Sequence, residues 1–177
     1  PHGDAPGDTW LVSPRRRALR WIAPVLAGLL LSLAFPPAEW NGLAWVALVP
    51  LLLAPAPPRL RARFALGYLF GITHFLTCLL WLTEVTVIGW MLLSATCALF
   101  PAAWYCAAAR HRRRQPHEPS GRGLRTALRP AGSVLILAAL WVAAELVRSW
   151  IFTGFPWNLL GVSQWANRLV LPLCTIT

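Results

Sequence analysis

The sequence predicts an all-α membrane protein, a polytopic helical bundle with about five transmembrane segments and the start of a sixth. Of its 177 residues, 57% are apolar and only 12% are charged, and the mean hydropathy is +0.55. Ordinary soluble domains are less apolar and carry about twice that share of charge. The apolar residues form runs that approach the ~20 residues a helix needs to cross the ~30 Å hydrocarbon core. The sixteen basic residues, all arginine, gather in the polar intervals between these runs.

The predicted elements follow from these runs. Residues 1–17 are expected to form an N-terminal cytoplasmic tail, and residues 18–177 one transmembrane domain. The last three runs are long enough to span, whereas the first two are short. That first pair either spans with help from flanking residues or forms a re-entrant hairpin, and both alternatives return the chain to the same side. The predicted helices cover residues 18–35, 40–56, 64–82, 89–109 and 131–152.

The arginines predict the orientation. Fourteen of the sixteen lie before or at the start of the first helix, follow the second, or lie in the segment 110–130 between the fourth and fifth. The opposite connections, 36–39 and 83–88, contain none. By the positive-inside rule the N-terminus is cytoplasmic and the fifth helix ends outside. Residues 110–130 are expected to form a flexible cytoplasmic loop near anionic headgroups. Topology accounts for this charge, and no aromatic residues interleave with it, so a nucleic-acid partner is not predicted.

Cysteine and histidine spacing predicts no metal site, disulfide framework or cofactor. Cys78, Cys97, Cys106 and Cys174 form no CxxC pair. His74 and Cys78 share a helix face, but no third ligand is evident, so a packed or hydrogen-bonded histidine is favoured. Glu84 is interpreted as a solvated loop carboxylate rather than a base. No catalytic motif is visible, and no catalytic residue is predicted in this chain.

Two charges lie at membrane depth in the fifth predicted helix, where each costs roughly 2.5–3.5 kcal/mol at a helix centre. Glu145 and Arg148 are three residues apart and can pair on one helix face. Two interpretations stay open. The residues form a structural ion pair near the outer end of the helix, or one of them meets a phospholipid headgroup in an outer-leaflet cavity.

The segment 153–165 after this helix is aromatic and glycine-punctuated. It is either an interfacial belt, with Trp157 and Trp165 at headgroup level, or a shaped outer-face turn. Gly154, Pro156 and Gly161 favour a defined shape because they permit positive φ or stiffen the chain. Glu145, Arg148, Trp157 and Asn158 are the residues expected to hold this outer surface in shape or to contact lipid.

Two stretches of the sequence resemble one family. The first reads LAFPP at 33–37 and WVALVPLL at 45–52, and the second runs from Trp141 to Gln164 with the strings ELVRSW and TGFPWNLLGVSQ. With Gly67, Gly71 and Trp81, these strings are similar to the N-terminal membrane region of bacterial apolipoprotein N-acyltransferase. The resemblance covers residues 19–165, apart from the arginine-rich segment between the fourth and fifth helices, which looks like a variable insertion.

This resemblance implies a multi-pass enzyme of the bacterial inner membrane that matures lipoproteins. The family moves an acyl chain from a phospholipid to the N-terminal diacylglyceryl cysteine of an apolipoprotein. Its nitrilase-like periplasmic domain uses a Cys nucleophile, a Glu base and a Lys, and the acyl group is held as a thioester between two easier steps. The present chain contains no lysine, and Cys174 is not equated with the nucleophile. These 177 residues are therefore expected to be inactive alone.

The expected role of this region is to present the phospholipid donor and the apolipoprotein acceptor to the catalytic domain. Because the sequence starts at Pro1 without Met and stops at Thr177 inside an apolar stretch, it is expected to be a fragment. The alternative is a non-catalytic membrane scaffold that binds a partner enzyme such as a polyprenol-phosphate glycosyltransferase. A coding frame that continues past Thr177 into a catalytic domain favours the acyltransferase. A transporter is disfavoured because no helix carries a central run of polar ligands.

Overall fold

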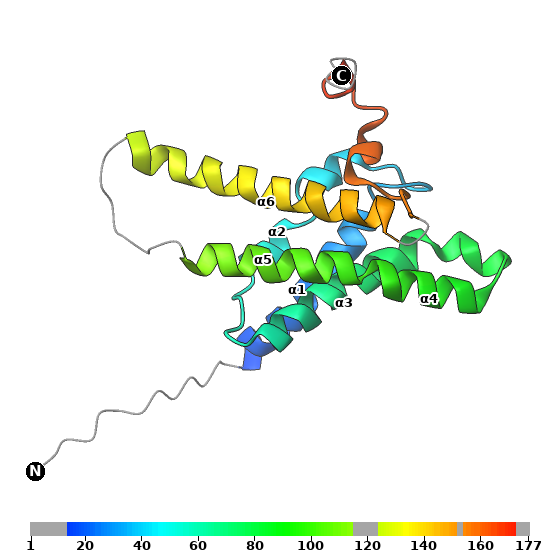
Figure 1. The fold of residues 1–177 in the computed structure, drawn as a ribbon, viewed down its shortest axis with the longest axis horizontal. Helices are drawn as coiled ribbons and strands as arrows, with labels where there is room; N and C mark the ends of the chain where they lie inside the picture. Colours follow the sequence, from blue (N-terminus) through cyan, green and yellow to red (C-terminus); the bar gives the residue numbers. More distant parts are fainter. Residues whose placement is uncertain (1–13, 115–123, 152–153, 173–177) are drawn as a thin grey trace, which may run out of the picture.

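All regular elements are helices in the residues that the structure, a computed structural model, describes: 14–114, 124–151 and 154–172. The all-α prediction is therefore confirmed for this part of the chain. Thr153, Cys174, the first thirteen residues of the predicted tail and the middle of the predicted 110–130 loop lie outside the described residues. In chain order the elements are α1 (Pro14–Ser32), η1 (Asn41–Trp45), α2 (Val49–Leu53), α3 (Leu60–Cys78), η2 (Leu80–Glu84), α4 (Val87–Cys97), α5 (Leu99–Arg114), α6 (Leu124–Trp150) and η3 (Leu160–Gln164) (Figure 1).

Two helical stretches of the described chain are long and apolar enough to cross a membrane. They are Val87–Arg114, which combines α4 and α5, and Ala131–Trp150 of α6. Ala18–Ser32 and Asn41–Leu53 are apolar but shorter. The count of about five spans is not confirmed, although the apolar character that predicted a membrane protein is seen in these helices.

The second predicted helix, 40–56, is not continuous. The 3₁₀-helix η1 and the α-helix α2 have five residues each, so α2 extends only ~7.5 Å at 1.5 Å per residue. Pro50 stands in the first turn of α2, the one part of a helix where its missing N–H costs nothing. This segment is folded as short pieces and is too short to cross a bilayer as a single helix.

The predicted loop 110–130 is shorter at both ends than expected. Helix α5 continues to Arg114, and α6 already begins at Leu124. Leucine, alanine and arginine are strong helix formers, and the cations in the last turn of α5 lie where the helix dipole favours positive charge. Helical propensity therefore extends both helices into a segment whose charge suggested a loop.

Helix α3 packs against both α1 and α5. Its contact with α5 is close because two glycines face that helix. A Cβ at Gly67 would lie 2.8 Å from both Ala102 Cα and Tyr105 Cβ, and one at Gly71 would lie 2.9 Å from Ala98 Cα. This four-residue spacing of small residues is the pattern that lets membrane helices approach backbone to backbone.

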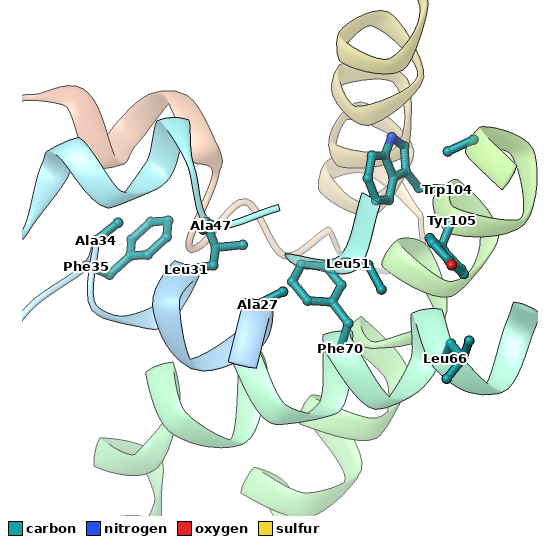
Figure 2. Packing of buried hydrophobic residues seen from close by; sticks show 11 residues of the cluster. Ala27, Leu31, Ala34, Phe35, Ala47, Leu51, Leu66, Phe70, Trp104 and Tyr105 are labelled. Carbon is teal, nitrogen blue, oxygen red and sulfur yellow. The ribbon is translucent and has the colours of Figure 1, made fainter. Parts of the chain in front are cut away.

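The main core lies where α1, α2, α3 and α5 meet. Figure 2 shows Phe70 of α3 facing Ala27 of α1 and Leu51 of α2, with Trp104 and Tyr105 supplied by α5. Helix α6 joins this core through tryptophan, since the Trp104 indole N–H donates to the Leu137 carbonyl oxygen at 3.0 Å. The rings of Trp104 and Trp141 meet edge to face with centroids 5.0 Å apart. This contact fixes α6 beside α5.

The helices place their arginine-rich ends together. In Figure 1 the starts of α1, α3 and α6 and the end of α5 lie toward the left, and η1, η2, η3 and the end of α6 lie toward the right. The left-hand ends are those beside which the sequence clusters its arginines. The right-hand end contains the segments for which the sequence predicted an outer surface.

Candidate functional site at the end of helix α6

Helix α6 ends in a turn that requires glycine. The Phe155 N–H donates to the Arg148 carbonyl oxygen at 3.1 Å, and the Gly154 N–H donates to the Ile151 carbonyl oxygen at 2.9 Å. Gly154 has φ +73°, and a Cβ there would collide with the carbonyl oxygen of Ser149. Only glycine adopts this left-handed conformation in such a close approach without strain. The chain therefore folds back over the last turns of α6.

Arg148 is enclosed by this returning chain, with only 4% of its surface exposed. Its Nη1 donates to the carbonyl oxygens of Phe155 at 2.9 Å and Trp157 at 2.7 Å. The guanidinium carbon also lies 5.2 Å from the centre of the Phe75 ring of α3, within the range of a cation–π interaction. Arg148 thus ties the turn to α6 and α3.

Glu145 lies one turn earlier on α6 and binds the same returning segment. Its Oε1 accepts a hydrogen bond from the backbone N–H of Leu160, the first residue of η3, at 2.7 Å. Within the described chain Glu145 and Arg148 form no ion pair with each other, so the direct pairing considered from their spacing is not observed. The turn supplies a carbonyl acceptor for the cation and an N–H donor for the carboxylate, and each charge is satisfied by backbone.

Trp157 and Asn158 lie in the chain between Phe155, which Arg148 binds, and Leu160, which Glu145 binds. Trp157 is 55% exposed, and the centroid of its ring lies 5.7 Å from that of Trp81 and 6.3 Å from that of Phe155. Its backbone carbonyl is held by Arg148, so this residue combines features of the belt and of the shaped turn. Asn158 adopts a left-handed conformation with φ 53°. Its Nδ2 is buried and has no hydrogen-bond partner.

Two hollows adjoin Arg148. A cavity of about 20 Å³ is lined by Glu145, Arg148, Asn158 and His74 together with aromatic and other apolar residues, and a cavity of this size holds about one water molecule. A larger groove of about 370 Å³ opens between α4, the start of α5 and the end of α6. It is mainly apolar and includes Arg148 in its lining, so it can bury a hydrocarbon chain close to a cation. Its apolar walls come from Leu92, Leu93, Phe100, Ile151 and Phe155.

A second hydrogen-bond network, centred on Gln164, joins η3 to η1. The sequence did not predict it. Gln164 is 7% exposed; its Oε1 accepts from Trp45 Nε1 at 3.0 Å, and its Nε2 donates to the Asn41 carbonyl oxygen at 2.8 Å. Asn167 Nδ2 also donates to Gln164 Oε1 at 2.8 Å. Trp45 and Gln164 each lie in a string that carries the family resemblance. Membership of those strings was the one feature of the sequence that pointed to these two residues.

Two further candidate residues have structural or exposed positions: His74 borders the small cavity beside Arg148, and Glu84 lies away from it. His74 is buried, and its Nδ1 lies 3.1 Å from Ser32 Oγ and 3.7 Å from Cys78 Sγ. This is the packed, hydrogen-bonded histidine that the sequence favoured. Among the described residues no group of three or more His, Cys, Asp or Glu side chains could hold a metal ion. Glu84 is exposed at the end of η2.

Comparison with known proteins decides the family. Residues 27–177 match the family described as apolipoprotein N-acyltransferase N-terminal domain. The chain belongs to the apolipoprotein N-acyltransferase family. The resemblance found in the strings at 33–52 and 141–164 is therefore confirmed, and the matched range contains every residue of the site at the end of α6.

Curated relatives named apolipoprotein N-acyltransferase match most of this chain. The protein of Geobacter metallireducens is 33% identical over 171 residues, covering 93% of this chain and 30% of its own length. That of Ralstonia nicotianae is 34% identical over 174 residues, covering 89% of this chain and 31% of its own length. A shorter match to the protein of Pseudomonas aeruginosa reaches 56% identity over 43 residues, 24% of this chain and 8% of that protein. The chain spans about 30% of the length of its first two relatives.

Proposed function

We propose that this chain is the membrane-embedded N-terminal part of an apolipoprotein N-acyltransferase, a multi-pass protein of the bacterial inner membrane with its N-terminus in the cytoplasm. The observation that carries the proposal is the match of residues 27–177 to the N-terminal domain of that family. The apolar stretches Val87–Arg114 and Ala131–Trp150 support the membrane location. The arginine clusters support the orientation.

The proposed reaction of the whole enzyme has two steps, both outside this chain. A cysteine thiolate attacks the ester carbonyl of a phospholipid, forms a thioester and releases the lysophospholipid alcohol. The α-amino group of the diacylglyceryl cysteine then attacks the thioester, forms an amide and releases the thiolate. The nucleophile, the glutamate base and the lysine belong to a further domain, and the present residues are inactive alone.

The proposed contribution of this region is positioning. The groove of about 370 Å³ is suited to the acyl chain of a phospholipid because its walls are mainly apolar and the cation Arg148 is part of its lining. Glu145, Arg148, Trp157 and Asn158 keep the surrounding turn in one shape, so that donor and acceptor lipids reach the catalytic domain in a fixed orientation. Holding two reactants in place converts an encounter between molecules into an effectively intramolecular step.

A complementation experiment tests the proposal. The complete native coding frame that contains these residues is expressed in a bacterium depleted of its own apolipoprotein N-acyltransferase. We expect mass spectrometry of a reporter lipoprotein to show restored N-acylation, and a version ending at Thr177 to restore none. A complete frame that leaves the lipoprotein amine free, while the membrane protein co-purifies with a polyprenol-phosphate glycosyltransferase, would establish the scaffold instead.

A further inference from the structure

The starts of α1 and α3 and the end of α5 each carry an arginine whose charge acts on one buried tyrosine of the core. Tyr105 of α5 is fully buried, and Figure 2 shows its hydroxyl-bearing ring in the core beside Leu66. Its phenol lies within the electrostatic influence of Arg112, Arg20 and Arg63. These belong to α5, α1 and α3, and α3 packs against both other helices. Positive charge is thus concentrated in one place by the fold.

The hydrogen-bonding groups of this cluster are only partly satisfied. Arg63 is held, since its Nε donates to the Pro57 carbonyl oxygen and its Nη2 to that of Pro58, both at 2.8 Å. In contrast, Arg20 Nε, Arg112 Nη1 and the Tyr105 hydroxyl are buried without a hydrogen-bond partner. A buried polar group left unpaired costs about 1–3 kcal/mol, and a charged one costs more. Because both arginines act electrostatically on the Tyr105 phenol, an anionic acceptor near that phenol would be attracted by both and would give unpaired donors a partner.

The described part of the chain supplies no acidic side chain to this cluster. Its three carboxylates belong to Glu39, Glu84 and Glu145. Glu39 follows the end of α1, Glu84 lies in η2 beyond the end of α3, and Glu145 lies near the end of α6. The arginines lie near the opposite helix ends, so the cluster needs an anion from outside these residues.

We propose that the ends of α1, α3 and α5 bind a phosphate group through Arg20, Arg112 and the Tyr105 hydroxyl, with Arg63 adding positive charge. Several donors on different helices suit a group that presents oxygens in several directions, and guanidinium groups bind phosphate through paired, charge-assisted hydrogen bonds. The headgroup of an anionic phospholipid and inorganic phosphate share this chemistry. The site is separate from the groove beside Arg148 and does not depend on acyl transfer.

The location favours a lipid headgroup as the source of the phosphate. Arg20, Arg63 and Arg112 lie near helix ends that border apolar segments, and anionic headgroups at that level attract each arginine by about 1 kcal/mol. A bound headgroup would link α1 to α5 across α3. The site would then hold the helices together only in a membrane that contains anionic lipid.

Binding to the full native protein in neutral detergent micelles tests the site. The midpoint of thermal unfolding is followed while short-chain phosphatidylglycerol, short-chain phosphatidylcholine or inorganic phosphate is added. We expect saturable stabilisation by phosphatidylglycerol and much less by phosphatidylcholine. Arg112→Gln should bind roughly tenfold more weakly, the loss expected for one charge-assisted hydrogen bond. Arg113→Gln is the matched control because it removes the same charge from an exposed neighbour on α5.

These measurements distinguish a lipid headgroup from free phosphate as the ligand. Weaker phosphatidylglycerol binding in Arg112→Gln, with Arg113→Gln unchanged, supports a lipid-headgroup site. Saturable stabilisation by inorganic phosphate alone, with the same difference between variants, supports a site for free phosphate. If neither probe binds saturably, or if both variants weaken binding equally, the proposal is wrong. Should Arg112→Gln fail to fold, Tyr105→Phe provides the same comparison by removing a single oxygen atom.

Discussion

Arg148 is the residue on which the turn after α6 depends most. Its guanidinium donates to two carbonyl oxygens of the returning chain and is 4% exposed. Replacing it by glutamine leaves these carbonyls without a charged donor. Hydrogen bonds to charged groups are worth about 1.5–3 kcal/mol each, so we expect Arg148→Gln to lower the free energy of unfolding by about 3 kcal/mol. Denaturant titration of the detergent-solubilised protein measures this loss.

Arg168→Gln is the control for that substitution. Arg168 is exposed, so the same change of charge should alter the free energy of unfolding by less than about 0.5 kcal/mol. Equal losses in the two variants would mean that net charge, rather than the bonds to Phe155 and Trp157, determines stability.

Glu145 offers a second test at the same scale, because its role is to accept a hydrogen bond from the Leu160 N–H. Glutamine retains an acceptor oxygen, whereas leucine does not. We therefore expect Glu145→Gln to lower the unfolding midpoint much less than Glu145→Leu, which leaves the partly buried Leu160 N–H unpaired at a cost of about 1 kcal/mol, the lower end of the range for a buried group. If the carboxylate charge were essential through Arg148, both substitutions would be equally damaging in the same thermal unfolding measurement.

The sequence could identify these charges but not their partners. Glu145 and Arg148 stand out because charge at membrane depth is expensive, and their spacing suggested a pair. Their actual partners are backbone groups of residues 155–160, and backbone groups leave no signature in side-chain identity. Gln164 was missed for a related reason. A polar residue near a helix end is ordinary in a sequence, and only the fold brings it to Trp45, 119 residues away.

At the scale of elements, the contact between α3 and α5 depends on the absence of side chains. A Cβ at Gly67 would come within 2.8 Å of Ala102 Cα, a backbone atom that cannot rotate away. We expect Gly67→Val to separate the helices and to lower the free energy of unfolding by about 1–3 kcal/mol, the usual cost of overpacking. Gly132→Ala is the control, since a Cβ there meets nothing within 4 Å. A stable Gly67→Val variant would show that α3 and α5 are not tightly packed.

The hydrogen-bond network between η1 and η3 gives a further test at the scale of elements. Gln164→Leu keeps similar volume but removes the hydrogen bonds to Trp45, Asn41 and Asn167. We expect the backbone amides of residues 41–47 to exchange hydrogen at least tenfold faster, because losing about 1.4 kcal/mol of local stability raises the open population by that factor. Trp45→Phe removes one of these bonds and should have a smaller effect. Unchanged amide hydrogen exchange in Gln164→Leu would show that η1 keeps its position without the hydrogen bonds of Gln164.

Element types could be predicted better than element lengths. Apolar runs predicted helices at 64–82, 89–109 and 131–152, and helices occupy most of each range. The sequence did not predict the breaks within these helices, however. Helix α4 gives way to α5 at Ala98. Pro101, which lacks an N–H to donate to the carbonyl of Cys97 four residues earlier, provides the physical reason. The same hydrophobicity is compatible with one helix or two, so composition alone does not locate such a break.

At the scale of the whole molecule, the distribution of apolar surface supports a lipid environment. Leu135 and Trp150 on α6 are 70% and 84% exposed. The helix is fixed to the core along one flank by Trp104 and Trp141. Such a large apolar surface is unfavourable in water and ordinary in hydrocarbon. Lipid, or further helices of a protein whose relatives are about three times as long, would cover it.

The orientation of the molecule in that lipid is the prediction on which the proposed function depends. The arginine-bearing starts of α1 and α3 and the end of α5 lie on one side of the fold, opposite η1, η2 and η3 (Figure 1). A bilayer that keeps these arginines in the cytoplasm places the turn after α6 outside. A periplasmic reporter enzyme fused just after Gln164 should therefore be active, and the same reporter fused after Arg114 should be inactive. Activity only in the second fusion would put the groove beside Arg148 on the cytoplasmic face, where a periplasmic catalytic domain has no access to it.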